Sequence, residues 1–209
     1  MHSMEPSASS KPDKPIAAVI LAAGRSSRFG KPKVLQSFKG QPFLTRISQP
    51  LNTLDLNPII LVLGYKARWL QQALPQSHIS QIIINEQFDY GQFSSLQSAV
   101  RIMPEPISGL LVCLIDQPHL HPSTYERIVH KARHQPECII IPKYQQKKGH
   151  PVYLPKVLMD DILKAPPESR LDTMIKKRQN VMRLIEVDDP GILQDIDTPS
   201  DLQRIEQQE

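Results

Sequence analysis

The sequence has few of the features that mark secreted, membrane-spanning or nucleic-acid-binding proteins. Its only two cysteines, Cys113 and Cys138, lie in apolar runs without CxxC spacing. This usage predicts buried reduced thiols and a cytoplasmic protein. No stretch reaches the roughly 18 apolar residues of a membrane span, and no dense block of lysine and arginine occurs. We therefore expect neither a membrane nor a nucleic acid as a partner.

Aromatic residues are also few, at 5%, whereas the 20 prolines are scattered between apolar runs and indicate loops. Residues 1–14 are polar and lack the apolar core of a secretion signal, so we expect a disordered tail there. Hydrophobic residues make up 40% of the chain and charged residues 22%, which is typical of a globular protein. Residues 15–209 are predicted to form a single domain, and the net charge of +4 suits an anionic ligand such as a nucleotide.

Short apolar runs that end at turn residues predict the strands of a buried sheet. They are rich in isoleucine, valine and leucine and lie at residues 16–24, 58–65, 81–88, 109–116 and 137–144, with later strands expected at 149–155 and 181–189. Continuous apolar runs of this length are typical of parallel strands that helices cover on both faces.

Helices are predicted between these strands, at residues 42–54, 66–74, 94–103, 121–134, 157–165, 171–179 and 198–207. We expect a break at Pro50, a serine N-cap at the start of 94–103, and a capping box of Ser123 and Glu126. Thr198 before Pro199 predicts the N-cap of the last helix. The alternation predicts an α/β fold, doubly wound and Rossmann-like, with a mostly parallel sheet and helices on both faces.

The stretch LAAGRSSRFGKPK, at residues 21–33, combines glycines with cations directly after the first predicted strand. It is not a Walker A loop, because five residues separate Gly24 from Gly30 and Lys31 is followed by proline. It also lacks the second glycine of a dinucleotide-binding fingerprint. Glycines let backbone N–H groups face an anion, and the fork of Arg28 suits phosphate oxygens. By composition alone, a phosphate cradle and a plain basic surface loop are equally supported.

Acidic residues at two further positions are candidate ligands of a divalent cation. Asp116 ends the run 109–116, where ligands bind in open α/β sheets, although it also fits a simple turn before Pro118. Asp195 and Asp197 share a face if their segment is extended, so either side chain can reach a metal; both also fit solvated acids ahead of a helix cap. Magnesium takes one or two carboxylates together with phosphate oxygens and water.

The glycine-containing stretch resembles the signature loop, LxxGxxxRxGxxK, of nucleotidyltransferases that join a nucleoside triphosphate to a phosphate-bearing acceptor. More closely, the chain resembles the molybdenum cofactor cytidylyltransferases of the MobA-like superfamily. Four further segments match that group in order: GQFSSLQSAV (91–100), LIDQPHL (114–120), GHPVYL (149–154) and DIDTPSDL (195–202). The resemblance implies that residues 15–209 form one nucleotidyltransferase domain.

The resemblance also implies a role for each matched residue. The nucleotide would contact Leu21, Ala22, Ala23, Gly24, Arg28, Gly30, Lys33, Gly91, Ser94 and Ser95. Arg28, Lys33 and Asp116 would be catalytic, and Asp116 and Asp197 would hold Mg²⁺. Gly149, His150 and Pro151 would shape the acceptor side.

The implied reaction is transfer of CMP from CTP to a molybdopterin-type acceptor, with release of pyrophosphate; a molybdoenzyme of the xanthine dehydrogenase type would receive the product. The Ala-Ala-Gly start at residues 22–24 accompanies CTP in this group. The alternatives are guanylyl transfer to the same cofactor, transfer to a sugar or polyol phosphate, and a non-catalytic cofactor chaperone. Two departures from the group's pattern, Ile115 and the segment ESRLDTMI (168–175), leave the acceptor less defined than the nucleotide.

Overall fold

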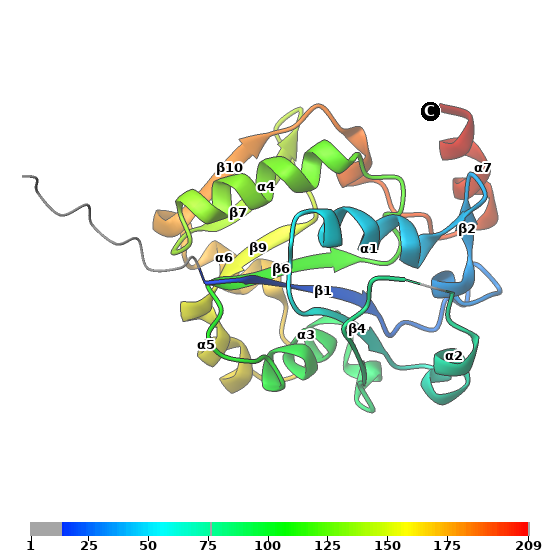
Figure 1. The fold of residues 1–209 in the computed structure, drawn as a ribbon, viewed down its shortest axis with the longest axis horizontal. Helices are drawn as coiled ribbons and strands as arrows, with labels where there is room; N and C mark the ends of the chain where they lie inside the picture. The colour runs from blue at the N-terminus through cyan, green and yellow to red at the C-terminus, as the bar shows by residue number, and fades with distance from the viewer. Residues whose placement is uncertain (1–13, 76, 209) are drawn as a thin grey trace, which may run out of the picture.

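The computed structural model describes residues 14–75 and 77–208, so the predicted tail lies, apart from Lys14, outside the described residues. Its centre is an eight-stranded sheet in the order β10-β7-β9-β6-β1-β4-β5, with β8 paired to β7 (Figure 1). The strands are β1 (Ile16–Ala22), β4 (Ile59–Leu63), β5 (Gln81–Ile84), β6 (Gly109–Leu114), β7 (Ile139–Tyr144), β8 (Lys147–Lys148), β9 (Val152–Pro155) and β10 (Met182–Glu186). A separate hairpin pairs β2 (Ser37–Phe38) with β3 (Gln41–Pro42).

The sheet is mostly parallel, as predicted. Strand β1 pairs in parallel with β4 and β6, as β4 does with β5 and β10 with β7, whereas β9 runs antiparallel between β6 and β7. The chain first adds β4 and β5 on one side of β1 and then returns to place β6 on the other side. The loops after β1 and β6 therefore diverge, and a crevice forms at their carboxyl ends.

Helices cover both faces of this sheet. Figure 1 shows α1 (Phe43–Thr53) and α4 (Pro122–His134) on one face, and α3 (Gln92–Arg101) and α5 (Met159–Lys164) on the other. The remaining helices are α2 (Ala67–Ala73), α6 (Leu171–Lys176) and α7 (Pro199–Gln208). Alternate residues of β1 enter two cores: Ala18 and Ile20 pack on the α1 and α4 side, and Val19 and Leu21 on the α3 and α5 side. The doubly wound α/β fold is confirmed.

The predicted capping box of α4 is wrong. Pro122 occupies the first helical turn and moves the helix start upstream, so Ser123 lies inside the helix and makes no cap. The carboxylate of Asp189, from a distant segment, instead accepts the backbone N–H of His121 at 3.0 Å. A long-range contact thus replaces the local box of Ser123 and Glu126.

Two other local predictions fail because tertiary packing decides them. Helix α1 runs through Pro50 without a break, since Ile47 and Leu51 on either side of it are fully buried against the sheet. Helix α3 begins after Gly91, whose φ of 101° suits glycine, and Ser94 does not cap it.

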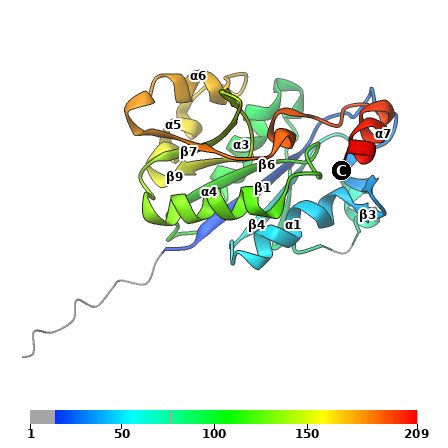
Figure 2. The ribbon, with the colours of Figure 1, turned by 90° about the horizontal axis from the view of Figure 1, so that it is seen from above.

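The N-cap of α7 is confirmed. The Thr198 hydroxyl accepts the backbone N–H of Asp201 at 3.1 Å, and the Asp201 carboxylate accepts that of Thr198 at 2.9 Å. In Figure 2, α7 lies beside β3, and the Lys39 backbone N–H donates to Glu206 at 2.7 Å. Both cysteines are buried and free, and within the described part of the chain no helix is long and apolar enough to cross a bilayer.

Candidate active site

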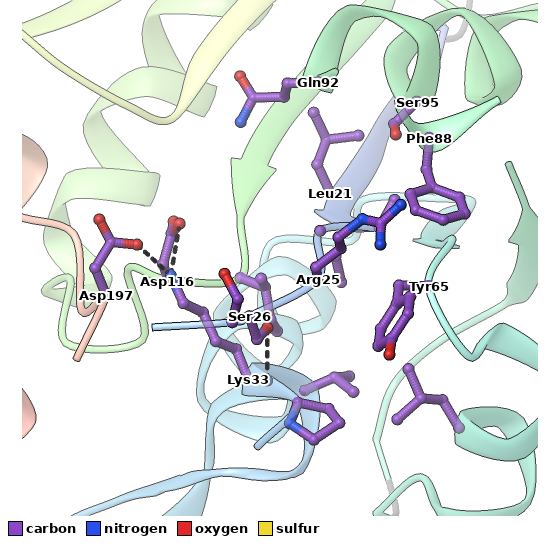
Figure 3. Close-up of a pocket in the computed structure, with 18 of the residues that line it drawn as sticks. Leu21, Arg25, Ser26, Lys33, Tyr65, Phe88, Gln92, Ser95, Asp116 and Asp197 are labelled. Atoms are coloured by element: carbon purple, nitrogen blue, oxygen red, sulfur yellow. Dashed lines mark hydrogen bonds and ion pairs between the residues drawn. The ribbon is translucent and has the colours of Figure 1, made fainter. Parts of the chain in front are cut away.

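A cavity of about 360 Å³ opens at the carboxyl ends of β1 and β6 (Figure 3). Its lining includes most of the residues predicted to contact a nucleotide or metal: Leu21, Ala22, Ala23, Gly24, Arg28, Lys33, Gly91, Ser95, Asp116 and Asp197. Gly30 and Ser94 are not part of the lining. Residues from both ends of the sequence therefore meet at one edge of the sheet.

The predicted cations and carboxylates contact one another directly in this cavity. The Lys33 ammonium lies 2.7 Å from Asp197 Oδ1 and 3.3 Å from Asp116 Oδ2. The Arg28 guanidinium lies 2.8 Å from the other oxygen of Asp197. Lys33 is thus held between two carboxylates that come from distant parts of the chain, as Figure 3 shows.

The carboxylate of Asp116 combines burial with a nearby cation, the Lys33 ammonium. Burial raises the pKa of Asp116, and the ammonium of Lys33 opposes that rise. Among the described residues, Asp116 Oδ1 has no hydrogen-bond partner although it is buried. A buried carboxylate oxygen without a partner is costly, so this position suits an additional cation or donor.

Ser26 organises the loop that carries Lys33, a role the sequence analysis missed. Its φ of 50° is left-handed, and its carbonyl accepts the N–H groups of Phe29 and Gly30, both at 3.1 Å. Its hydroxyl also accepts the Lys33 N–H at 3.3 Å. Local turns therefore place the Lys33 backbone beside the cavity, and Gly30 belongs to the turn rather than to the wall.

A second missed residue, Asn85, fixes the start of α3. Asn85 is 3% exposed, and its amide donates to the hydroxyls of Ser94 at 2.9 Å and Ser95 at 3.0 Å. Its oxygen accepts the Gln87 N–H at 2.9 Å. The Ser94 hydroxyl also contacts the carbonyls of Gln87 and Gly91, and of the two serines only Ser95 lines the cavity.

Aromatic residues form the wall opposite the two carboxylates (Figure 3). The Arg25 guanidinium lies 5.5 Å from the ring centroids of both Tyr65 and Phe88, and it pairs with Asp89 at 2.8 Å. This wall was not predicted from the sequence. Its signal was present, since Tyr65 and Phe88 follow β4 and β5 at the same edge of the sheet.

A second cavity, of about 650 Å³, adjoins the first and shares Leu21, Gly91 and Gln92 with it. Of the residues predicted for the acceptor side, Gly149 and His150 line it and Pro151 does not. Its charged lining residues are Lys148, Glu168, Arg170, Asp172 and Lys176.

Close packing explains Gly149. A Cβ at this position would collide with the carbonyl of Ile192, which accepts the next backbone N–H, that of His150, at 3.3 Å. Burial lowers the pKa of His150, so its imidazole is neutral at pH 7.

The structure separates the two aspartates near the C-terminus. Asp197 lines the first cavity, whereas Asp195 does not and accepts a hydrogen bond from Gln117 at 2.9 Å. In the described part of the chain, no group of three or more His, Cys, Asp or Glu side chains is arranged to hold a metal. Any cation bound here would thus rely on Asp116 and Asp197 together with substrate oxygens.

Comparison with known families agrees with this geometry. Residues 18–181 match the MobA-like NTP transferase domain. The chain belongs to this family. A curated relative, the bifunctional protein GlmU of Bifidobacterium animalis subsp. lactis, is 34% identical to this chain over 119 residues. That match spans 54% of the chain but only 26% of the relative's length.

Solved structures share the fold of this chain. Rv0371c of Mycobacterium tuberculosis superimposes with a TM-score of 0.79 at 24% identity, over 94% of this chain and all of that one; another structure of it is a complex with manganese. Molybdopterin-guanine dinucleotide biosynthesis protein A of Archaeoglobus fulgidus gives a TM-score of 0.65 at 19% identity, over 92% of this chain and 97% of that one.

Proposed function

We propose that the protein is a metal-dependent nucleotidyltransferase that moves CMP from CTP to a molybdopterin-type acceptor and releases pyrophosphate. The contact of Lys33 with both Asp116 and Asp197 carries this proposal, because it joins the cationic loop to the two candidate metal ligands. The first cavity would hold the nucleotide and the second the acceptor, which would meet near Leu21.

Asp116 and Asp197 would hold the divalent cation, which we take to be Mg²⁺. They fit it, because they already flank one positive charge and because Asp116 Oδ1 is buried with no partner among the residues described. When bound, such a cation neutralises phosphate charge and polarises the phosphoryl group under attack.

The cationic residues would bind the triphosphate. The side chain of Arg28 is 70% exposed, so its guanidinium is free to turn from Asp197 toward phosphate oxygens. Lys33 supplies a buried point charge beside it. Both charges would stabilise the departing pyrophosphate, and no protein nucleophile is needed because positioning and electrostatics carry phosphoryl-type transfers.

The nucleobase and the acceptor each have alternatives. The Ala-Ala-Gly start at residues 22–24 favours CTP, whereas the likeness to the Archaeoglobus protein favours guanylyl transfer as the second candidate. Transfer to a sugar or polyol phosphate is a third. The product would pass to a molybdoenzyme of the xanthine dehydrogenase type, in the cytoplasm.

Pyrophosphate release tests the proposal directly. The protein is incubated with Mg²⁺, a molybdopterin-type acceptor, and CTP, GTP, ATP or UTP in turn. We expect release with CTP to exceed that with the other nucleotides. Faster release with GTP would overturn the base assignment, and release only with sugar or polyol phosphates would overturn the acceptor.

Asp116→Ala separates an enzyme from a cofactor chaperone. We expect this variant to bind acceptor and to lose turnover, because acceptor binding alone does not need the carboxylate. Asp160→Ala, an exposed substitution on α5, is the matched control and should keep full activity. Turnover retained in Asp116→Ala would contradict the enzymatic proposal.

A further inference from the structure

A set of contacts behind the cavity ties together the two segments that carry Asp116 and Asp197. The Asp116 carbonyl accepts the backbone N–H of Ile196 at 2.9 Å. Gln117 follows Asp116 directly, and its amide donates to Asp195 Oδ1 at 2.9 Å and to the Ile192 carbonyl at 3.5 Å. Every contact therefore involves a direct neighbour, or the backbone, of a proposed metal ligand.

Two of the residues in this set of contacts are buried and one is exposed. Gln117 is 3% exposed and Ile196 is fully buried, whereas Asp195 is exposed. The Gln117 amide makes its hydrogen bonds through nitrogen, since its buried oxygen has no partner in the described part of the chain. The exposed side chain of Asp195 therefore accepts its hydrogen bond from a buried amide, that of Gln117, whose orientation is fixed.

We propose that Gln117 and Asp195 are positioning residues that set the separation of the Asp116 and Asp197 carboxylates, and thereby the affinity for a divalent cation. This inference rests on the proposed metal-dependent function. Partners of this kind behind metal ligands commonly change metal affinity about 10- to 100-fold when they are removed. Neither residue touches the substrate cavity, so both act through the ligands.

The test measures Mn²⁺ affinity by electron paramagnetic resonance, with the full chain and a CTP analogue that has a methylene group between the α- and β-phosphorus atoms. We expect Asp195→Ala to weaken Mn²⁺ binding about tenfold. Asp195→Asn should bind nearly as the unsubstituted protein does, because its amide oxygen still accepts from Gln117. Asp188→Ala removes the same charge from an exposed position earlier in the chain and should change nothing.

Equal weakening in Asp195→Asn and Asp195→Ala would overturn the proposal, because the charge of Asp195 rather than its hydrogen bond would then matter. Unchanged affinity in Asp195→Ala would overturn it as well. Gln117→Met repeats the test from the buried side, with thermal unfolding to establish that the variant folds. Asp197→Ala distinguishes the two levels: unchanged Mn²⁺ affinity there would remove the proposed metal site itself, whereas weakening there without weakening in Asp195→Ala would remove the positioning role alone.

Discussion

The two adjoining cavities are built in different ways. The first is formed by short segments that follow parallel strands, and opposite charges meet inside it, as in the contact of Lys33 with Asp116 and Asp197. The second is larger and lies beside the antiparallel strand β9, and residues of α6 form part of its lining. Opposite charges also meet in the second cavity, where Asp172 pairs with Arg170 and Lys176, but these side chains are exposed.

The comparison teaches that the first cavity is organised around a buried cation between two carboxylates, whereas the charges of the second belong to exposed side chains. In the first, parallel strands deliver their loops to one edge, so a few residues at strand ends suffice to assemble it. In the second, Gly149 is required because a neighbouring backbone approaches closely, which is a property of packing. Variants on either side should therefore fail in different ways.

Replacing one cation on each side gives the largest expected contrast. Lys33→Met should lower kcat by about 100- to 1000-fold with every acceptor, because it removes charge stabilisation at the reacting phosphates. Arg170→Met, in the second cavity, should raise the KM for the acceptor and leave kcat nearly unchanged, because it removes binding alone. Steady-state pyrophosphate release measures both values. A kcat near normal in Lys33→Met would erase the contrast.

The first cavity was largely predictable from the sequence. Lys33, Asp116 and Asp197 each lie in a short matched segment, and strand ends bring such segments together. The choice between Asp195 and Asp197 was not decided by spacing, because both fit a shared face. In the structure Asp197 pairs with Lys33 and lines the cavity, whereas Asp195 accepts a hydrogen bond from Gln117.

What the sequence did not reveal depends on partners that lie far away along the chain. Asp189 is 2% exposed, and its carboxylate accepts from His121, Thr124 and Gly191. Asn85 supports the start of α3 in the opposite sense, because its amide donates to the Ser94 hydroxyl. A polar residue in a loop gives no local sign that distant donors will surround it, so its structural role cannot be read from spacing.

Asn85→Ala sharpens the comparison, because it removes hydrogen bonds that hold residues beside the first cavity. The substitution removes the amide that holds Ser94 and Ser95 and leaves the Gln87 N–H without its acceptor. We expect a loss of about 1–3 kcal/mol in the free energy of unfolding, measured by urea denaturation. Nucleotide affinity should fall with it. The exposed Asn52→Ala is the control, and equal stability of the two variants would argue against the network.

Thr198→Ala tests the same cavity from the other end of the chain. The Asp201 carboxylate accepts from the N–H groups of both Thr198 and Asp197, so the cap of α7 also holds a proposed metal ligand. Loss of the capping hydroxyl should cost about 1 kcal/mol of unfolding free energy, and Thr198→Ser should restore it. If Thr198→Ser is as unstable as Thr198→Ala, the methyl group rather than the cap stabilises this end.

The smallest effect is expected from His150, and it concerns the second cavity. Because burial lowers its pKa, the unfolded chain binds a proton at this residue before the folded protein does as the pH falls. Stability is therefore full above the ordinary histidine pKa of about 6.5 and declines below it, until the lowered pKa is reached. His150→Gln lacks this contribution, so its unfolding free energy should fall less steeply than that of the unsubstituted protein below about pH 6.5. Urea denaturation at several pH values measures both slopes. Equal slopes would mean that folding does not lower the pKa of His150, which would contradict this prediction.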